Sequence, residues 1–180
     1  MKKKMIAALL TAAMAVTSLS GVAVSAADNS TDEKVEMADA SDVDGTTITF
    51  WHSMGGVNGE AIDTLVKKFN DENEYGITVD AQYQGEYDDS LNKLKSAQIG
   101  NMGADLVQVY EIGTRFMIDS GWIVPMQEMI DADGYDVSEI EPNLAAYYTI
   151  DNKLYSMPFN SSTPIMYYNK DMFDKAGITE

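Results

Sequence analysis

A run of short hydroxyl side chains stands between two apolar segments late in the sequence. Ser161, Ser162 and Thr163 follow Phe159-Asn160 and are followed by Pro164 and four large side chains. Serine and threonine hydroxyls both donate and accept hydrogen bonds, so a run of them can bind the oxygens of a polar small molecule. Such residues do not build a hydrophobic core. We therefore take this segment as a candidate ligand-binding site.

The sequence gives little support for catalysis. His52 is the single histidine, and Ser53 follows it directly. Side chains of adjacent residues on an extended chain point to opposite sides, so these two are not expected to form a nucleophile–base pair. A zinc site would need more ligands of the histidine or cysteine type. We predict no catalytic residue, and His52 is interpreted as a loop residue at the end of a strand.

Two other segments resemble ligand-binding motifs only in part. The sequence DADGYD (131–136) has three carboxylates around a glycine but lacks the order and the late glutamate of a calcium loop. The sequence GGVNG (55–59) precedes an expected helix, where an anion could bind, yet it matches neither of the glycine-rich nucleotide motifs. We predict a turn with solvated acids in the first case, and neither a metal nor a cofactor for the chain.

Composition narrows the range of partners. The chain has 180 residues and a formal net charge of −17, with no basic stripe, so nucleic acid and anionic membrane surfaces are poor partners. It contains no cysteine, which excludes disulfides, thiol catalysis and cysteine-based zinc sites. A lipid-modified cysteine at the start of a mature chain is excluded as well.

The N-terminal segment has the pattern of a secretory signal peptide. Three lysines at positions 2–4 precede an apolar stretch, and small residues follow at positions 24–26. This arrangement predicts residues 1–26 as a signal peptide that is removed on export, with an uncleaved anchor as the alternative. Residues 27–45 are acidic and without periodicity, so we predict a disordered linker there, with the folded region beginning near Thr46.

Strands and helices alternate through the first part of the folded region. The patterns predict strands at 46–51, 77–84 and 104–110 and helices at 60–73, 88–101 and 112–122. We expect the third strand to be central, the helix of 88–101 to stop at Gly100 and the third helix to end at Gly121. This alternation is typical of an α/β fold with a parallel sheet between helices.

The pattern changes after Pro125. Short amphipathic pieces are followed by an expected hairpin that turns at Asp151-Asn152 and by a strand at 164–169. Asn169 is then a candidate N-cap for a helix that Gly177 closes. A doubly wound sheet seldom ends at such a point, so we expect the chain to be a fragment of a longer protein.

Polar and aromatic residues follow each of the three expected strands. Ligands of open α/β sheets bind outside the carboxyl ends of the strands, so these residues and the hydroxyl run could line one cleft. They are Trp51 and His52 after the first strand, Tyr87 after the second, Tyr110 and Glu111 after the third, and Ser161, Ser162 and Thr163.

Four segments together resemble a known family. They are FWHSMGG, YQGEYDDSL, LVQVYEIGT and MPFNSSTPIMYYNKDMFDKAGI, spread over residues 48–178. They are similar to extracytoplasmic solute-binding proteins of ABC importers, within the carbohydrate-binding family, and most like its sn-glycerol-3-phosphate-binding branch. The first and last segments are the most specific.

This resemblance implies a periplasmic-binding-protein-like fold of type II, in which two α/β lobes close on a ligand. Residues 46–162 would form the first lobe, and residues 163–180 the crossover and the start of the second. Tyr87, Glu111 and Ser162 would contact the ligand, with Ser161, Trp51 and His52 nearby. The resemblance also implies an arginine contact in the second lobe, and Arg115 is not assigned that role.

The function implied is delivery of glycerol 3-phosphate or a glycerophosphodiester to the permease subunits of an ABC transporter. A binding protein for an uncharged sugar or oligosaccharide is the alternative, and a secreted hydrolase is less favoured because no acid–base pair is evident. With an export signal and no cysteine for lipid attachment, the expected location is the periplasm or the cell exterior.

Overall fold

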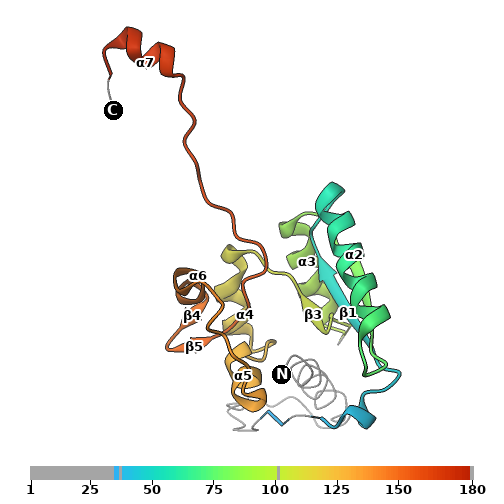
Figure 1. The fold of residues 1–180 in the computed structure, drawn as a ribbon. Helices are drawn as coiled ribbons and strands as arrows, with labels where there is room; N and C mark the ends of the chain where they lie inside the picture. The colour runs from blue at the N-terminus through green and yellow to red at the C-terminus, as the bar shows by residue number, and fades with distance from the viewer. Residues whose placement is uncertain (1–34, 37, 101, 179–180) are drawn as a thin grey trace.

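The computed structural model describes residues 35–36, 38–100 and 102–178 (Figure 1). The expected signal peptide, residues 1–26, and the first part of the expected linker lie outside the described residues. Within the described part, no helix combines the length and apolar character that a bilayer crossing requires.

A three-stranded parallel sheet organises the first part of the fold. Its strands are β1 (Thr47–His52), β2 (Thr78–Tyr83) and β3 (Leu106–Val107), in the order β2-β1-β3. β1 and β2 pair along their full length, from Thr47 opposite Thr78 to His52 opposite Tyr83. The parallel sheet expected from the alternating pattern is confirmed.

The expectation for the third strand was wrong in length and in position. β3 has two residues instead of the seven expected at 104–110, and it lies at the edge while β1 is central. Side-chain hydrogen bonds add to the contact between β3 and β1 at both ends of β3. Asp105 accepts from the Thr49 N–H at 2.9 Å, and the Gln108 side chain accepts from the Ser53 N–H at 2.9 Å.

Two helices, α2 (Gly56–Glu72) and α3 (Tyr87–Gln98), run alongside this sheet (Figure 1). α2 begins four residues earlier than predicted, inside the expected glycine loop. A Cβ at position 59 would lie 2.8 Å from the Met54 carbonyl oxygen, so glycine at this position allows the chain to turn tightly into the helix. α3 ends at Gln98, two residues before the predicted stop at Gly100.

The core at one end of the sheet is built from Val43, Ile48 and Ile77, which are at most 6% exposed. Val43 belongs to the range expected as a linker, and it follows the short 3-10 helix η1 (Ala40–Asp42). Its complete burial means that packing against the sheet begins before Thr46.

Short helices follow β3. They are the 3-10 helix η2 (Glu111–Gly113), α4 (Thr114–Ser120), α5 (Met126–Asp133) and α6 (Pro142–Tyr147). Gly121 ends α4 with φ 66°, as the sequence predicted. The acidic segment of 131–136 begins in the last turn of α5, which Gly134 closes at φ 65°, and continues beyond the helix. Among the described residues no group of three or more metal-ligating side chains gathers.

The expected hairpin is confirmed. β4 (Thr149–Ile150) and β5 (Lys153–Leu154) pair antiparallel around Asp151 and Asn152. Both turn residues have positive φ, 52° and 62°, as a two-residue type I′ turn requires. The Lys153 ammonium donates to the Glu128 carboxylate at 3.0 Å, which joins the hairpin to α5.

The strand expected at 164–169 is absent. Residues 160–169, called the arm below, run extended without a paired strand and lead to α7 (Lys170–Ala176), which lies away from the rest of the chain (Figure 1). An extended segment becomes a strand only when another strand pairs with it. The boundaries of α7 are confirmed, because Asn169 accepts from the Met172 N–H at 3.1 Å and Gly177 closes the helix at φ 71°.

Candidate functional site

Two of the predicted tyrosines lie face to face at the carboxyl edge of the sheet. Tyr87 is the first residue of α3, which follows β2, and Tyr110 follows β3, so the two strands that flank β1 deliver both to the same edge. Their ring centroids are 5.4 Å apart and the planes differ by 5°. The Tyr110 hydroxyl donates to the Asp88 carboxylate. This hydrogen bond stabilises the protonated phenol and is the main reason why the pKa of Tyr110 is raised.

A chain of side-chain amides joins this edge to the base of the arm. Gln108 accepts from the Ser53 backbone N–H at 2.9 Å and donates to the Asn160 side-chain oxygen at 2.7 Å. The Asn160 amide nitrogen in turn donates to the Tyr87 hydroxyl oxygen across a longer 3.4 Å. The loop after β1, the end of β3, the start of α3 and the arm are therefore connected by hydrogen bonds.

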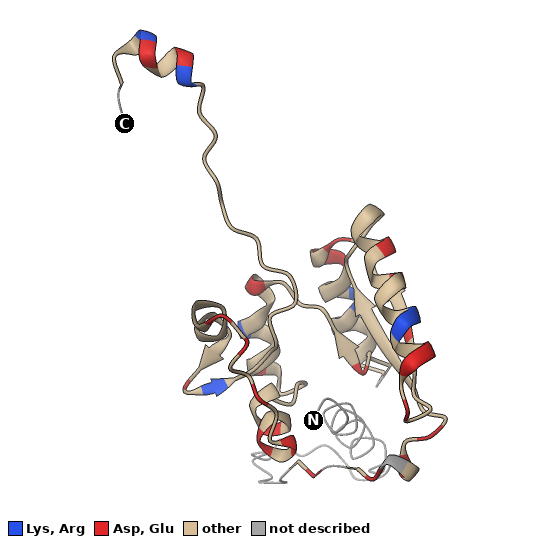
Figure 2. Cartoon of the chain, viewed as in Figure 1, with Lys and Arg blue, Asp and Glu red and all other residues tan. Residues whose placement is uncertain are grey.

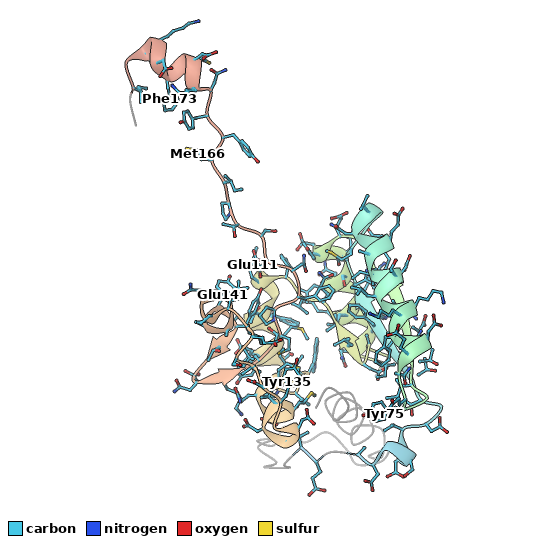
Figure 3. The ribbon with its side chains drawn as sticks, in the orientation of Figure 1. Tyr75, Glu111, Tyr135, Glu141, Met166 and Phe173 are labelled. Atoms are coloured by element: carbon cyan, nitrogen blue, oxygen red, sulfur yellow. The ribbon has the colours of Figure 1, made fainter. Side chains whose placement is uncertain are left out.

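The remaining residues of the predicted site lie next to these connected groups in the chain. Ser161 and Ser162 follow Asn160 directly, and both are exposed. Glu111 follows Tyr110, is exposed and begins η2; Figure 3 labels it near the point where the arm leaves the body. The structure thus brings together Tyr87, Tyr110 and the base of the arm, with Glu111 one residue away from the stacked pair.

Trp51 and His52 have packing partners of their own. The Trp51 indole N–H donates to the Gln82 side-chain oxygen at 3.1 Å. His52 is 3% exposed, with its ring between those of Phe50 and Tyr83. Its Nδ1 accepts from the Met54 N–H at 3.3 Å. A ligand contact for these two residues remains a prediction.

The electrostatic environment of the site is set by burial and by local ion pairs. Burial lowers the pKa of His52, and the charge of Asp63 opposes that shift in part.

Arg115 lies in α4, as expected, and pairs with Asp119 at 2.6 Å on the same helix. Figure 2 shows acidic residues spread over the body and α7, with fewer basic residues among them.

Gln108 and Asn160 were not among the site residues predicted from the sequence. The sequence contains one indication of a special role for each of these two residues. Gln108 interrupts the apolar run LVQVY, and Asn160 precedes the hydroxyl run. A polar side chain in an otherwise buried strand usually has a specific hydrogen-bond partner. This rule could have marked Gln108, although it does not identify the partner.

The arrangement can bind a small molecule that is rich in hydroxyl and phosphate oxygens. Phenol and serine hydroxyls donate to acceptor oxygens, and a carboxylate accepts from ligand hydroxyls. Within the described residues, the His52 side chain accepts from the Met54 backbone N–H and the Ser53 hydroxyl has no hydrogen-bond partner, so the two do not form a nucleophile–base pair.

Comparison with known families supports this reading. The profile of the family described as bacterial extracellular solute-binding protein matches residues 64–180 of the chain. The match begins inside α2 and includes every element of the candidate site except the end of β1.

Among curated proteins, the chain is 45% identical to the sn-glycerol-3-phosphate-binding periplasmic protein UgpB of Salmonella typhimurium, over 74% of the chain and 31% of that protein. Its identity to the protein of the same name from Escherichia coli strain K12 is 44%, over the same shares of the two chains. The chain therefore spans about a third of the length of the curated relatives that it matches.

Solved structures show the same likeness. UgpB of Mycobacterium tuberculosis in complex with glycerophosphocholine superposes with a TM-score of 0.63 and 28% identity, over 73% of this chain and 33% of that one. An ABC substrate-binding protein of Listeria monocytogenes in complex with cycloalternan gives a TM-score of 0.52 at 24% identity, over 75% and 34%. The second likeness concerns the fold alone. The predicted α/β, periplasmic-binding-protein-like fold is confirmed by these neighbours.

Proposed function

The chain belongs to the bacterial extracellular solute-binding proteins, and on this premise we propose that it binds glycerol 3-phosphate or a glycerophosphodiester for an ABC importer. The observation that carries the proposal is the convergence of Tyr87 with the base of the arm at the carboxyl edge of the sheet. This edge is where open α/β sheets bind their ligands. The 45% identity to a glycerol-3-phosphate-binding relative favours this ligand class.

The proposed roles follow from the chemistry of the side chains. The hydroxyls of Tyr87 and Ser162 would donate to phosphate or phosphodiester oxygens. The Glu111 carboxylate would accept from the glycerol hydroxyls, and a hydrogen bond to a charged group is about twice as strong as a neutral one. Ser161, Trp51 and His52 would border the site. Binding would leave the ligand chemically unchanged.

The chain would supply one wall of the binding cleft. We propose that residues 46–162 form the first lobe and that residues 163–180 lead into a second, since the chain spans about a third of its relatives. The loaded protein would deliver its ligand to the permease subunits from the periplasm or the cell exterior. The relatives named periplasmic support this location.

A chimaera with a relative tests the proposal. Residues 46–178 would replace the matching segment of the Escherichia coli relative, and calorimetry would measure the binding of sn-glycerol 3-phosphate, glycerophosphocholine and maltose. We expect the two phosphorylated ligands to bind and maltose to fail. Preferential binding of maltose would support the alternative of a neutral sugar, and release of choline from glycerophosphocholine would indicate a hydrolase.

The chimaera needs a control for the contribution of this chain, because the second lobe would come from the relative. Tyr87→Phe and Glu111→Ala are introduced into the chimaera for this purpose. Weakened binding in both variants would support the proposed wall. If both bind as tightly as the parent chimaera, the site does not lie at this edge of the sheet.

A further inference from the structure

We propose that Gln108 and Asn160 are positioning residues that fix the direction of the hydrogen bonds at Tyr87, so that its hydroxyl proton is donated to an acceptor oxygen of the ligand. The inference rests on the proposed function, in which Tyr87 faces the ligand. The inference explains why the Tyr87 hydroxyl acts as a hydrogen-bond donor. A donor at this position favours an anionic, acceptor-rich group such as a phosphate or phosphodiester.

The backbone N–H of Ser53 sets the donor-to-acceptor direction of these hydrogen bonds. A backbone N–H can only donate, so the Gln108 group at 2.9 Å from it must be the side-chain oxygen. The Gln108 NH₂ group is therefore turned towards the arm. It lies 2.7 Å from Asn160, and the atom of Asn160 that faces it must be the side-chain oxygen.

The orientation of Asn160 in turn determines the hydrogen bond at Tyr87. With its oxygen bound to Gln108, Asn160 can present only its NH₂ group to the Tyr87 hydroxyl, at 3.4 Å. The Tyr87 oxygen is then an acceptor towards Asn160, and its proton is left for another partner. Neither amide can be reversed alone, because each reversal would bring two donors or two acceptors together.

Within the described residues, the Tyr87 hydroxyl accepts from Asn160 and donates to no acceptor. The Tyr110 hydroxyl donates its own proton to Asp88, and stacking on Tyr110 holds the ring plane of Tyr87. Tyr87 itself is only partly buried, at the edge of the sheet where the arm begins. A ligand oxygen at this edge would receive the proton.

The two amides also locate the arm relative to the sheet. Gln108 bonds to the loop after β1 on one side and to the arm on the other, and Asn160 immediately precedes the hydroxyl run. Loss of the Gln108 side chain would release the base of the arm, and with it Ser161 and Ser162, from this edge.

The direction of the hydrogen bonds is tested by Gln108→Glu in the chimaera. A carboxylate at this position still accepts from Ser53 but cannot donate to Asn160. Asn160 must then turn its NH₂ group to the carboxylate and its oxygen to Tyr87, which uses the tyrosine proton. We expect the affinity for sn-glycerol 3-phosphate to fall roughly tenfold, the scale of one charge-assisted hydrogen bond. Adding Tyr87→Phe should cause little further loss.

A matched control separates this effect from simple charge repulsion. Gln84→Glu places the same charge after β2, outside the amide chain. Its effect should add fully to that of Tyr87→Phe, as independent effects do. Full additivity for Gln108→Glu with Tyr87→Phe would overturn the inference, because it would show that only the added charge matters.

The position of the arm is tested on the chain itself, without ligand. Because the sequence has no cysteine, spin labels can be placed at Lys68→Cys in α2 and Lys175→Cys in α7. Gln108→Ala should broaden the label-to-label distance distribution, whereas Ser161→Ala should not. An unchanged distribution in a folded Gln108→Ala variant would overturn the positioning role. This result does not depend on binding, so failure of the parent chimaera to bind would count against the proposed function alone.

Discussion

The side-chain amide of Asn73 bonds to both backbone groups of Ile77. Its nitrogen donates to the Ile77 carbonyl at 2.8 Å, and its oxygen accepts from the Ile77 N–H at 3.0 Å. Ile77 is 2% exposed, so water cannot readily replace these bonds. Asn73 also donates to the Phe69 carbonyl at 3.0 Å, and this one side chain therefore joins the end of α2 to the start of β2.

Asn73→Ala should lower the free energy of unfolding by about 2–3 kcal/mol, because it leaves buried backbone groups without partners. Asn73→Asp should cost less, since its carboxylate still accepts from Ile77 while the donor is lost. Urea denaturation followed by circular dichroism measures both. A loss in the alanine variant no larger than that of an exposed control such as Asn92→Ala would contradict this role.

The burial of His52 should make stability depend on pH. Burial lowers its folded-state pKa below the ordinary 6.5, so the unfolded chain binds more protons than the folded chain as the pH falls through 6.5. The stabilising contribution is complete above pH 6.5 and is lost as the pH falls from there towards the folded-state pKa. Thermal unfolding between pH 7.5 and 5.5 should show a falling Tm.

His52→Gln is the control for this pH dependence. It removes the ionisable group and should be less stable than the parent at pH 7.5, yet it should lack the part of the decline that begins near pH 6.5. An identical pH profile in the parent and the variant would assign the decline to other groups.

Glu111→Ala in the chimaera should weaken the binding of sn-glycerol 3-phosphate by roughly 1–3 kcal/mol, the range for losing a hydrogen bond to a charged group. Its side chain is exposed, so the Tm should change little. Calorimetry and thermal unfolding on the same preparation give both quantities. Unchanged affinity in a folded variant would remove Glu111 from the site.

Ser162→Ala should weaken binding by about 1 kcal/mol, because one hydroxyl donor is lost, and Ser162→Phe should abolish it by blocking closure of the cleft. Ser162 fills almost no core volume, so neither change should lower the Tm appreciably. If Ser162 instead bonds its own backbone in a turn, the alanine variant would lose stability and keep its affinity.

Features that depend on local chemistry were predicted well from the sequence. Asp151 and Asn152 tolerate positive φ, which fixed the hairpin turn. Gly121, Asn169 and Gly177 marked helix ends for the same kind of local reason. The parallel sheet followed from the alternation of strands and helices.

Features that depend on distant partners were predicted less well. The length of β3 is set by Asp105 and Gln108 bonding to residues more than fifty positions away. The segment of 164–169 has strand-forming residues, but pairing decides whether it becomes a strand. The strand ends indicated that Tyr87 and Tyr110 would share one edge of the sheet, whereas the hydrogen bonds of Gln108 and Asn160 could not be anticipated.

The arm also affects how separate copies of the protein associate in solution. Its residues 164–168, Pro-Ile-Met-Tyr-Tyr, carry no charge, and the last four are 61–91% exposed. Extended backbone with apolar side chains and no pairing partner is a template for edge-to-edge association. Proline at its start limits pairing on one side only. Until another segment covers residues 164–168, this stretch can pair with the same stretch of a second molecule, and the net charge of −17 on each molecule opposes that association.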